Sequence, residues 1–234
     1  MRASGKTRTA VIERSLRRRF RIVESTLRVA GRSISILHPA SAEELINEAD
    51  FERDERLPYW AELWPSSRIL AERVLRVRSG GRQLLELGCG AGLVATCASL
   101  AGFNVCASDY YDDALRFAVV NAARNGGEIE TQLLDWRSLP DEMRRFDVVV
   151  ASDVLYEQLY GPLVASAIAS TLAPGGIALV ADPGRVAEEA FVRSVAEKGL
   201  SVRARPTFPF VEGPIRQTIT VFEIRWGGRD SRSG

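Results

Sequence analysis

The chain has 234 residues with 31 basic and 30 acidic side chains, so its formal net charge is only +1, and 46% of its residues are hydrophobic. This is the composition of an ordinary soluble globular protein with one large domain, or one domain with an appendage. No apolar run approaches ~18 residues, so the sequence predicts no membrane-spanning helix and no membrane partner.

The cysteines and the histidine argue against two further kinds of site. Cys89, Cys97 and Cys106 are odd in number and lack CxxC spacing. This speaks against a zinc site or a disulfide framework and suits a reducing compartment, so we expect no metal and a cytoplasmic location. His38 is the only histidine and directly precedes Pro39, which argues against a catalytic triad with a histidine base.

The chain begins with a basic head. Residues 1–32 contain ten basic and two acidic side chains. Such a head could grip an acidic partner or a nucleic acid, or could be a transit peptide. Because no aromatic residue lies within residues 1–19, we favour a solvated terminus that is disordered or loosely helical.

Residues 20–56 are predicted to form a hairpin followed by an acidic helix. Apolar and polar residues alternate through residues 20–37 on both sides of Ala30 and Gly31, which is a hairpin pattern. Residues 41–56 are rich in acidic side chains and favour a helix.

The next segment, LPYWAELWPSS (residues 57–67), holds two of the four tryptophans of the chain, Trp60 and Trp64. At a spacing of i and i+4 they could share one buried face, or they could line a pocket for a flat ligand. A helix is expected from about Ser67, with Ser66 or Ser67 as its N-cap.

From residue 82 onward, strands and helices alternate. Strands are predicted at 83–87, 104–109, 129–135, 146–153 and 176–182, and helices at 93–101, 112–125, 158–172 and 186–198. This alternation is typical of βαβ units and a parallel sheet. Two last strand-like runs, 201–210 and 217–226, have a short linker and should pair antiparallel. The predicted fold class is therefore α/β: a Rossmann-like, doubly wound seven-stranded sheet with an antiparallel last strand, plus a small N-terminal β-hairpin and helix extension.

A glycine-rich turn, ELGCGAG, follows the first of these strands and opens a helix, which is the context of a nucleotide-binding loop. The third glycine arrives one residue earlier than in the G-x-G-x-x-G loop of dehydrogenases. The carboxylate of Glu86 would disfavour a pyrophosphate but could hold an ammonium group through water. A ligand with an ammonium group and a nucleoside but no phosphate is S-adenosylmethionine. We expect the residues of this turn to bind it: Glu86, Gly88, Cys89, Gly90 and Gly92.

Polar residues at the ends of the following strands extend this predicted site. Asp109, beside Tyr110, could accept hydrogen bonds from both ribose hydroxyls. Asp135 could accept a hydrogen bond from an exocyclic amine, and Trp136 could cover an adenine face. Each aspartate alone could be a helix cap. Together, at successive strand ends where open α/β sheets bind ligands, they predict a cofactor site, and Ser152 is expected to belong to it.

At this point the sequence resembles a known family. Residues 57–226 are similar to class I (seven-β-strand) S-adenosylmethionine-dependent methyltransferases, whose first motif ELGCGAG resembles. Four further pieces resemble the lysine methyltransferase group of the electron-transfer-flavoprotein β-subunit methyltransferases and the nicotinamide-type N-methylases: PYWAELWPSS, LLDW, SDVLY (residues 152–156) and ADPGR (residues 181–185). We therefore divide the chain into a head (1–19), a hairpin and acidic helix (20–56), a methyltransferase domain (57–226) and a disordered tail (227–234).

The resemblance implies roles for individual residues. Trp64 would form a wall of the cofactor pocket. Asp153 and Tyr156 would grip the target nitrogen as catalytic residues, and Asp182 and Arg185 would shape the substrate entrance. The alternative for Asp153 is a helix cap, and the alternative for the DPGR segment is a plain turn between strand and helix.

The implied activity is N-methylation of a lysine side chain in a protein substrate by a monomeric enzyme, with S-adenosylhomocysteine as the product. A small-molecule amine N-methylase and a catalytically silent binding protein remain open, although the intact Gly88, Asp109 and Asp153 argue against silence. A nucleic acid is disfavoured as the acceptor, because the motif after the fourth strand is not the NPPY type that grips a flipped base.

Overall fold

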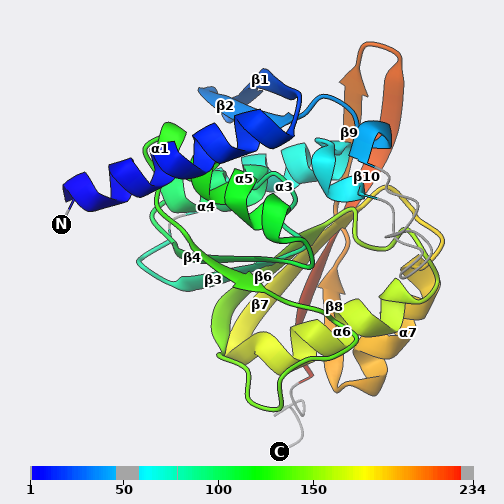
Figure 1. Cartoon of the computed structure of the whole chain (residues 1–234). Helices are drawn as coiled ribbons and strands as arrows, with labels where there is room; N and C mark the ends of the chain where they lie inside the picture. The colour runs from blue at the N-terminus through cyan, green and yellow to red at the C-terminus, as the bar shows by residue number, and fades with distance from the viewer. Residues whose placement is uncertain (1, 46–57, 78, 228–234) are drawn as a thin grey trace, which may run out of the picture.

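The structure is a computed structural model that describes residues 2–45, 58–77 and 79–227 (Figure 1). Most of the predicted acidic helix and the predicted disordered tail lie outside the described residues. At the start of the acidic segment, the described part has a short 3₁₀ turn, η1 (Glu43–Leu45).

The basic head, for which we expected disorder or a loose helix, is a helix, α1 (Arg2–Arg19). Its C-terminal half packs on α5 (Asp112–Arg124), where Leu16 is buried in a cluster with Phe117 and Val120. Arg19 also forms two hydrogen bonds with the carboxylate of Asp113, at 2.6 and 2.7 Å. One buried face therefore holds the helix against the domain, although most of its other residues are polar or charged.

The predicted hairpin is present as β1 (Ile22–Val29) and β2 (Arg32–Pro39), which pair antiparallel. Its two-residue turn has positive φ at both Ala30 (47°) and Gly31 (83°), as the right-handed strand twist requires. The side chain of Asn121 on α5 accepts a hydrogen bond from the N–H of Leu37 and donates one to its carbonyl, each at 2.8 Å. The hairpin is thereby fixed to the same helix as α1.

The main sheet has the predicted architecture. Within the described residues its strands follow the order β5-β4-β3-β6-β7-β10-β8, with the first five parallel and β10 antiparallel to both of its neighbours. The predicted run 201–210 is divided at Arg205 and Pro206 into two strands, and the second, β9, pairs with the first half of β10. The strand bounds are β3 (Gln83–Leu87), β4 (Asn104–Asp109), β5 (Glu130–Leu133), β6 (Phe146–Ser152), β7 (Leu172–Asp182), β8 (Leu200–Ala204), β9 (Thr207–Glu212) and β10 (Ile215–Trp226).

Helices cover both faces of this sheet, as a doubly wound fold requires (Figure 1). One apolar cluster joins the sheet to α3 (Pro65–Arg76), α4 (Leu93–Leu100) and α5. A second cluster joins the other face to α6 (Tyr160–Thr171) and α7 (Glu188–Glu197). The carboxyl ends of the parallel strands are left between these two layers, which is where this class of fold binds its ligands.

The start of α3 differs from the prediction. Trp64 is the N-cap residue and Pro65 is the first helical residue, so Ser66 and Ser67 lie inside the first turn. Proline suits this position because its missing N–H would have no partner within the helix. The Ser67 hydroxyl donates a hydrogen bond back to the carbonyl of Trp64 (2.7 Å), and the N–H of Ser66 donates to Asp153 (3.2 Å).

Candidate functional site

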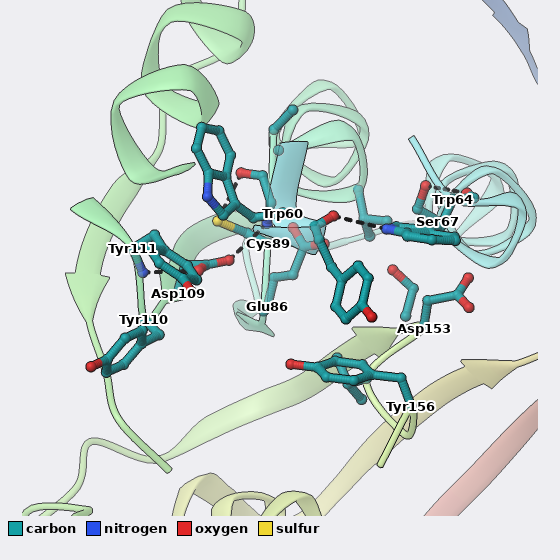
Figure 2. Close-up of a pocket in the computed structure, with 18 of the residues that line it drawn as sticks. Trp60, Trp64, Ser67, Glu86, Cys89, Asp109, Tyr110, Tyr111, Asp153 and Tyr156 are labelled. Carbon is teal, nitrogen blue, oxygen red and sulfur yellow. Dashed lines mark hydrogen bonds between the residues drawn. The ribbon is translucent and has the colours of Figure 1, made fainter. Parts of the chain in front are cut away.

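A cavity of about 960 Å³, open to solvent, lies at the carboxyl ends of β3, β4 and β6. Figure 2 shows Asp109, Tyr110 and Tyr111 on one side of it, Glu86 near the middle, and Trp64 and Asp153 on the other side. The cavity therefore has two ends, which are built from different parts of the chain.

The glycine-rich turn forms the floor of the cavity and depends on two glycines. Gly92 has φ +81°, and a Cβ there would lie 2.5 Å from the Cβ of Ala118 on α5. Gly90 has φ +50°, and a Cβ there would lie 3.0 Å from the carbonyl oxygen of Trp60. Larger residues would strain the backbone and push α4 or the Trp60 segment away. The glycines thus bring the turn close to both neighbouring segments.

Glu86 is a buried carboxylate in the cavity wall, only 1% exposed. Its Oε2 atom has no hydrogen-bond partner within the described residues. Burial raises the pKa of Glu86 well above its usual value, with a smaller raising effect from the charge of Asp109, against a lowering hydrogen bond from the backbone of Ala95. A buried, unpaired carboxylate is costly, so this atom fits a positively charged group such as the ammonium of S-adenosylmethionine.

Asp109 joins the turn to the end of β4. Its Oδ2 accepts a hydrogen bond from the N–H of Gly90 (2.9 Å), and its Oδ1 accepts one from the N–H of Tyr111 (3.0 Å). A carboxylate can accept hydrogen bonds from hydroxyl groups, and Asp109 lines the cavity. Tyr110 and Tyr111 line the same end of the cavity.

Asp135 and Trp136 reach the cavity from the segment after β5. Asp135 forms an ion pair with Arg137 (2.9 Å), which the sequence did not predict. The Trp136 ring lies edge-on to Tyr160, and its buried Nε1 has no hydrogen-bond partner among the described residues. The predicted residues Cys89 and Ser152 also line the cavity.

The other end of the cavity is aromatic. The Tyr59 ring contacts both Tyr156 (centroids 5.1 Å apart) and Trp64 (6.0 Å), and Tyr156 contacts Tyr160 (4.5 Å). The Trp64 Nε1 donates a hydrogen bond to the carbonyl of Tyr59 (2.9 Å) and so fixes the indole ring. Burial raises the pKa of Tyr156 above its usual range, so its hydroxyl stays protonated.

Asp153 lies at this aromatic end (Figure 2) and has three hydrogen bonds. Its Oδ1 accepts hydrogen bonds from Nη2 and Nε of Arg185 (2.8 and 3.1 Å), and its Oδ2 accepts one from the N–H of Ser66. The side chain is only 2% exposed, and the residue has φ +56°, an uncommon conformation for a residue other than glycine. The same Arg185 guanidinium lies 5.0 Å from the centre of the Trp64 ring. The aspartate therefore caps α3, rather than the following helix that the alternative interpretation had considered.

Asp182 and Arg185 both lie outside the lining of the cavity. Asp182 is fully buried. Its Oδ1 accepts hydrogen bonds from the N–H groups of Gly184 (2.8 Å) and Arg185 (2.6 Å). Asp182 thus shapes the turn that carries Arg185, because its carboxylate bonds to the backbone of that turn.

The two tryptophans of the segment after Pro58 have different roles. Both line the cavity. Trp60 also packs against Phe117 and Phe20, with centroids 5.7 and 6.1 Å away, while Trp64 lies at the aromatic end. They do not share one helical face, because Trp60 belongs to a 3₁₀ turn, η2 (Tyr59–Ala61), and Trp64 precedes α3. Sequence reasoning missed Tyr59, Tyr111 and Tyr160. Tyr59 and Tyr111 adjoin predicted site residues, and Tyr160 follows Tyr156 by four positions.

A comparison with protein families matches residues 59–209 to the family described as "Methyltransferase domain". The chain belongs to this methyltransferase domain family. The matched residues include the glycine-rich turn, the strand ends that line the cavity, and the segment with Trp64. The predicted resemblance to class I methyltransferases is thereby confirmed.

Two curated relatives match parts of the methyltransferase domain. The ribosomal protein L11 methyltransferase of Burkholderia cenocepacia is 35% identical over 140 residues, which are 59% of this chain and 44% of that protein. The electron transfer flavoprotein beta subunit lysine methyltransferase of Danio rerio is 27% identical over 131 residues, which are 55% of this chain and 51% of that protein. The chain thus spans about half the length of the curated relatives it matches.

Solved structures support the fold. The ribosomal protein L11 methylase of Lactobacillus delbrueckii matches with a TM-score of 0.53 at 21% identity, over 68% of this chain and 77% of that chain. The N-methyltransferase NodS of Bradyrhizobium japonicum, in complex with S-adenosyl-L-homocysteine, matches with a TM-score of 0.55 at 18% identity, over 77% and 94%. At these identities the likeness concerns the fold of the methyltransferase domain.

The described residues contain neither a membrane-spanning helix nor a metal-binding cluster. No helix there is long and apolar enough to cross a membrane. No group of three or more histidine, cysteine, aspartate or glutamate side chains in that part of the chain is arranged to hold a metal ion.

Proposed function

We propose that this protein is an S-adenosylmethionine-dependent N-methyltransferase that methylates a lysine side chain of a protein substrate. The main support for the proposal is that a single cavity has two ends with different chemistry. One end offers the unpaired carboxylate of Glu86 and the polar strand ends, and the other offers Asp153 among aromatic rings.

The cofactor end fits S-adenosylmethionine by the chemistry of its side chains. Glu86 would bind the ammonium of the methionine part, Asp109 the ribose hydroxyls, and Trp136 the adenine. The bound cofactor supplies a methyl group on an electrophilic sulfonium. Because that electrophile is already strong, what remains for the protein is to position the acceptor and exclude water.

The acceptor end suits an amine. A free lysine has a pKa near 10.4, so removing its proton at pH 7 costs about 4.6 kcal/mol. Asp153 could attract the ammonium and accept a hydrogen bond from it, and the rings of Trp64 and Tyr156 could stabilise its charge. These groups would orient the nitrogen lone pair toward the methyl group once the proton has left for solvent.

Two of the curated relatives support a protein acceptor, whereas two others are named ubiquinone biosynthesis O-methyltransferases. The names of the first two describe methyltransferases of a ribosomal protein and of a lysine in a flavoprotein subunit. A small-molecule amine remains the alternative outcome of the test below.

The test is incubation of the protein with methyl-labelled S-adenosylmethionine and a cell extract. We expect label in macromolecules that becomes soluble only after protease treatment, and less of it with the Glu86→Gln variant when the cofactor is limiting. Label in small molecules before protease treatment, or in nuclease-sensitive material, would contradict a protein acceptor.

A further inference from the structure

The Asp153 carboxylate already has a cation beside it, the guanidinium of Arg185. The pair joins the end of β6 to the turn after β7, and the guanidinium also lies over the Trp64 ring. One buried carboxylate and one aromatic face are the two kinds of contact that would recognise an ammonium ion. Arg185 therefore makes the contacts that the proposed acceptor would need.

An ammonium ion and the Arg185 guanidinium would compete for this carboxylate, because three of its about four acceptor positions are already taken. The Asp153 side chain is 2% exposed, and its other oxygen is engaged by the N–H of Ser66. An ammonium that reaches Oδ1 must replace at least one of the two hydrogen bonds from Arg185. Removing the guanidinium without a substitute would leave a buried charge unpaired, which is strongly unfavourable. An exchange of one cation for another avoids that cost.

The turn that carries Arg185 allows its side chain to move without the backbone. Asp182 holds the N–H groups of Gly184 and Arg185, so the base of the side chain is fixed. The Arg185 side chain is 30% exposed, so its guanidinium has a path to solvent. The movement needed is a change of side-chain rotamer, and such changes take place in nanoseconds or less at exposed positions.

We propose that Arg185 occupies the cation site of the acceptor when no acceptor is bound, and that an incoming alkylammonium group displaces it from Asp153 and Trp64. This inference rests on the proposed function, because it takes the acceptor to be an amine. In this proposal Arg185 selects the acceptor. Only a cationic group that can also lie on the Trp64 ring would replace both contacts that Arg185 gives up.

The probe is n-butylammonium, which has the chemistry of a lysine side chain, with n-butanol as its neutral analogue. Binding is followed by tryptophan fluorescence in the presence of S-adenosylhomocysteine. In Arg185→Gln the site has lost its own cation, so n-butylammonium should bind about tenfold more tightly than to the wild type. Arg185→Lys keeps a cation and should bind it about as weakly as the wild type. Binding of n-butanol should not change.

The chain offers a matched control in Arg73. Its guanidinium also pairs with a carboxylate, Glu223 (2.9 Å), and also lies over an aromatic ring, Phe208 (5.0 Å). Neither Glu223 nor Phe208 lines the cavity, whereas Asp153 and Trp64 do. Arg73→Gln should therefore leave the binding of n-butylammonium unchanged. The Asp153→Asn substitution added to Arg185→Gln should abolish the gain.

If Arg185→Gln does not fold, the proposal can still be tested by NMR on the wild-type protein. The Nε–H resonance of Arg185, assigned from its absence in Arg185→Lys, should shift and exchange faster with water as n-butylammonium is added. Equal binding by wild type and Arg185→Gln, or an Arg185 resonance that does not respond at saturation, would overturn the exchange. Either result leaves methyl transfer to lysine standing, whereas absence of methyl-lysine in the labelling test overturns the proposed function itself.

Discussion

The backbone N–H of Ser66 donates a hydrogen bond to Oδ2 of Asp153 across 3.2 Å, so the carboxylate at the end of β6 lies at the N-terminus of α3. A negative charge there is stabilised by the free N–H groups and the dipole of the helix. The segment before α3 carries Trp64, which lines the cavity. The position of the aromatic wall is therefore coupled to the residue that we propose binds the acceptor.

Asp153→Asn separates acceptor chemistry from cofactor binding. Asparagine keeps the shape and can accept the bond from Ser66, but it removes the charge that would attract the ammonium. We expect turnover to fall by about 10²-fold or more, the scale of a lost orienting or acid–base group. The affinity for S-adenosylhomocysteine, measured by calorimetry on the same preparation, should stay near that of the wild type. Near-normal turnover would leave Asp153 with its capping role alone.

Glu86→Gln should have opposite effects on stability and on cofactor binding. The substitution removes an unpaired buried carboxylate, so the free energy of unfolding without cofactor should increase at pH 7. It also removes the partner of the cofactor ammonium, so binding of S-adenosylhomocysteine should weaken by about 1–3 kcal/mol. Urea denaturation and calorimetry measure the two effects. Unchanged affinity would show that the ammonium binds elsewhere.

The raised pKa of Asp182 predicts that the free energy of unfolding depends on pH. Burial raises the pKa of Asp182 from 3.8 to about 6. Between these two pH values the folded protein holds a proton that the unfolded chain has lost. The free energy of unfolding should therefore fall as the pH rises through this window, by at most about 3 kcal/mol. Asp182→Asn does not titrate, so its urea denaturation series from pH 4 to 7 should show a shallower fall. Some slope should remain, because the pKa of Glu86 is raised in the same direction. A series parallel to that of the wild type would contradict this account.

Leu16→Ala tests whether α1 contributes to the fold. Leu16 is 1% exposed and packs with Phe117 and Val120, so its truncation should cost about 2–4 kcal/mol of unfolding free energy. Val11, on the same helix, is 52% exposed, and Val11→Ala should change stability by less than about 0.5 kcal/mol. Chemical denaturation of both variants gives the comparison. Equal, small effects would mean that the head is dispensable for folding.

The elements of the core could be predicted because their signals are local. The alternation of apolar strands and helices from residue 83 onward depends on residues that are close in sequence. The glycine-rich turn can likewise be read locally, because Gly90 and Gly92 adopt positive φ angles that favour glycine. The order of α1 could not be predicted in this way. Its buried face depends on Leu16 meeting α5, about a hundred positions away, and its many arginines conceal that face.

The site could be predicted in its members but not in its internal contacts. The strand-end positions of Glu86, Asp109 and Asp153 follow from topology. The pairing of Asp153 with Arg185 and Ser66 does not, because these residues are separated by 32 and 87 positions. The bonds of Asp182 to the backbone of its own turn are local, but they were not predicted either, because an aspartate at a strand end can face a ligand or its own turn.

The measurement that tests the account most directly is identification of the methylated group. A protein labelled by this enzyme and methyl-labelled S-adenosylmethionine is hydrolysed completely in acid, and the products are separated alongside methylated amino-acid standards. The account predicts that the label elutes with Nε-methylated lysine, and that Asp153→Asn yields little of it. Label that elutes with methylated arginine or histidine, or that is lost as methanol from a carboxyl ester, would contradict it.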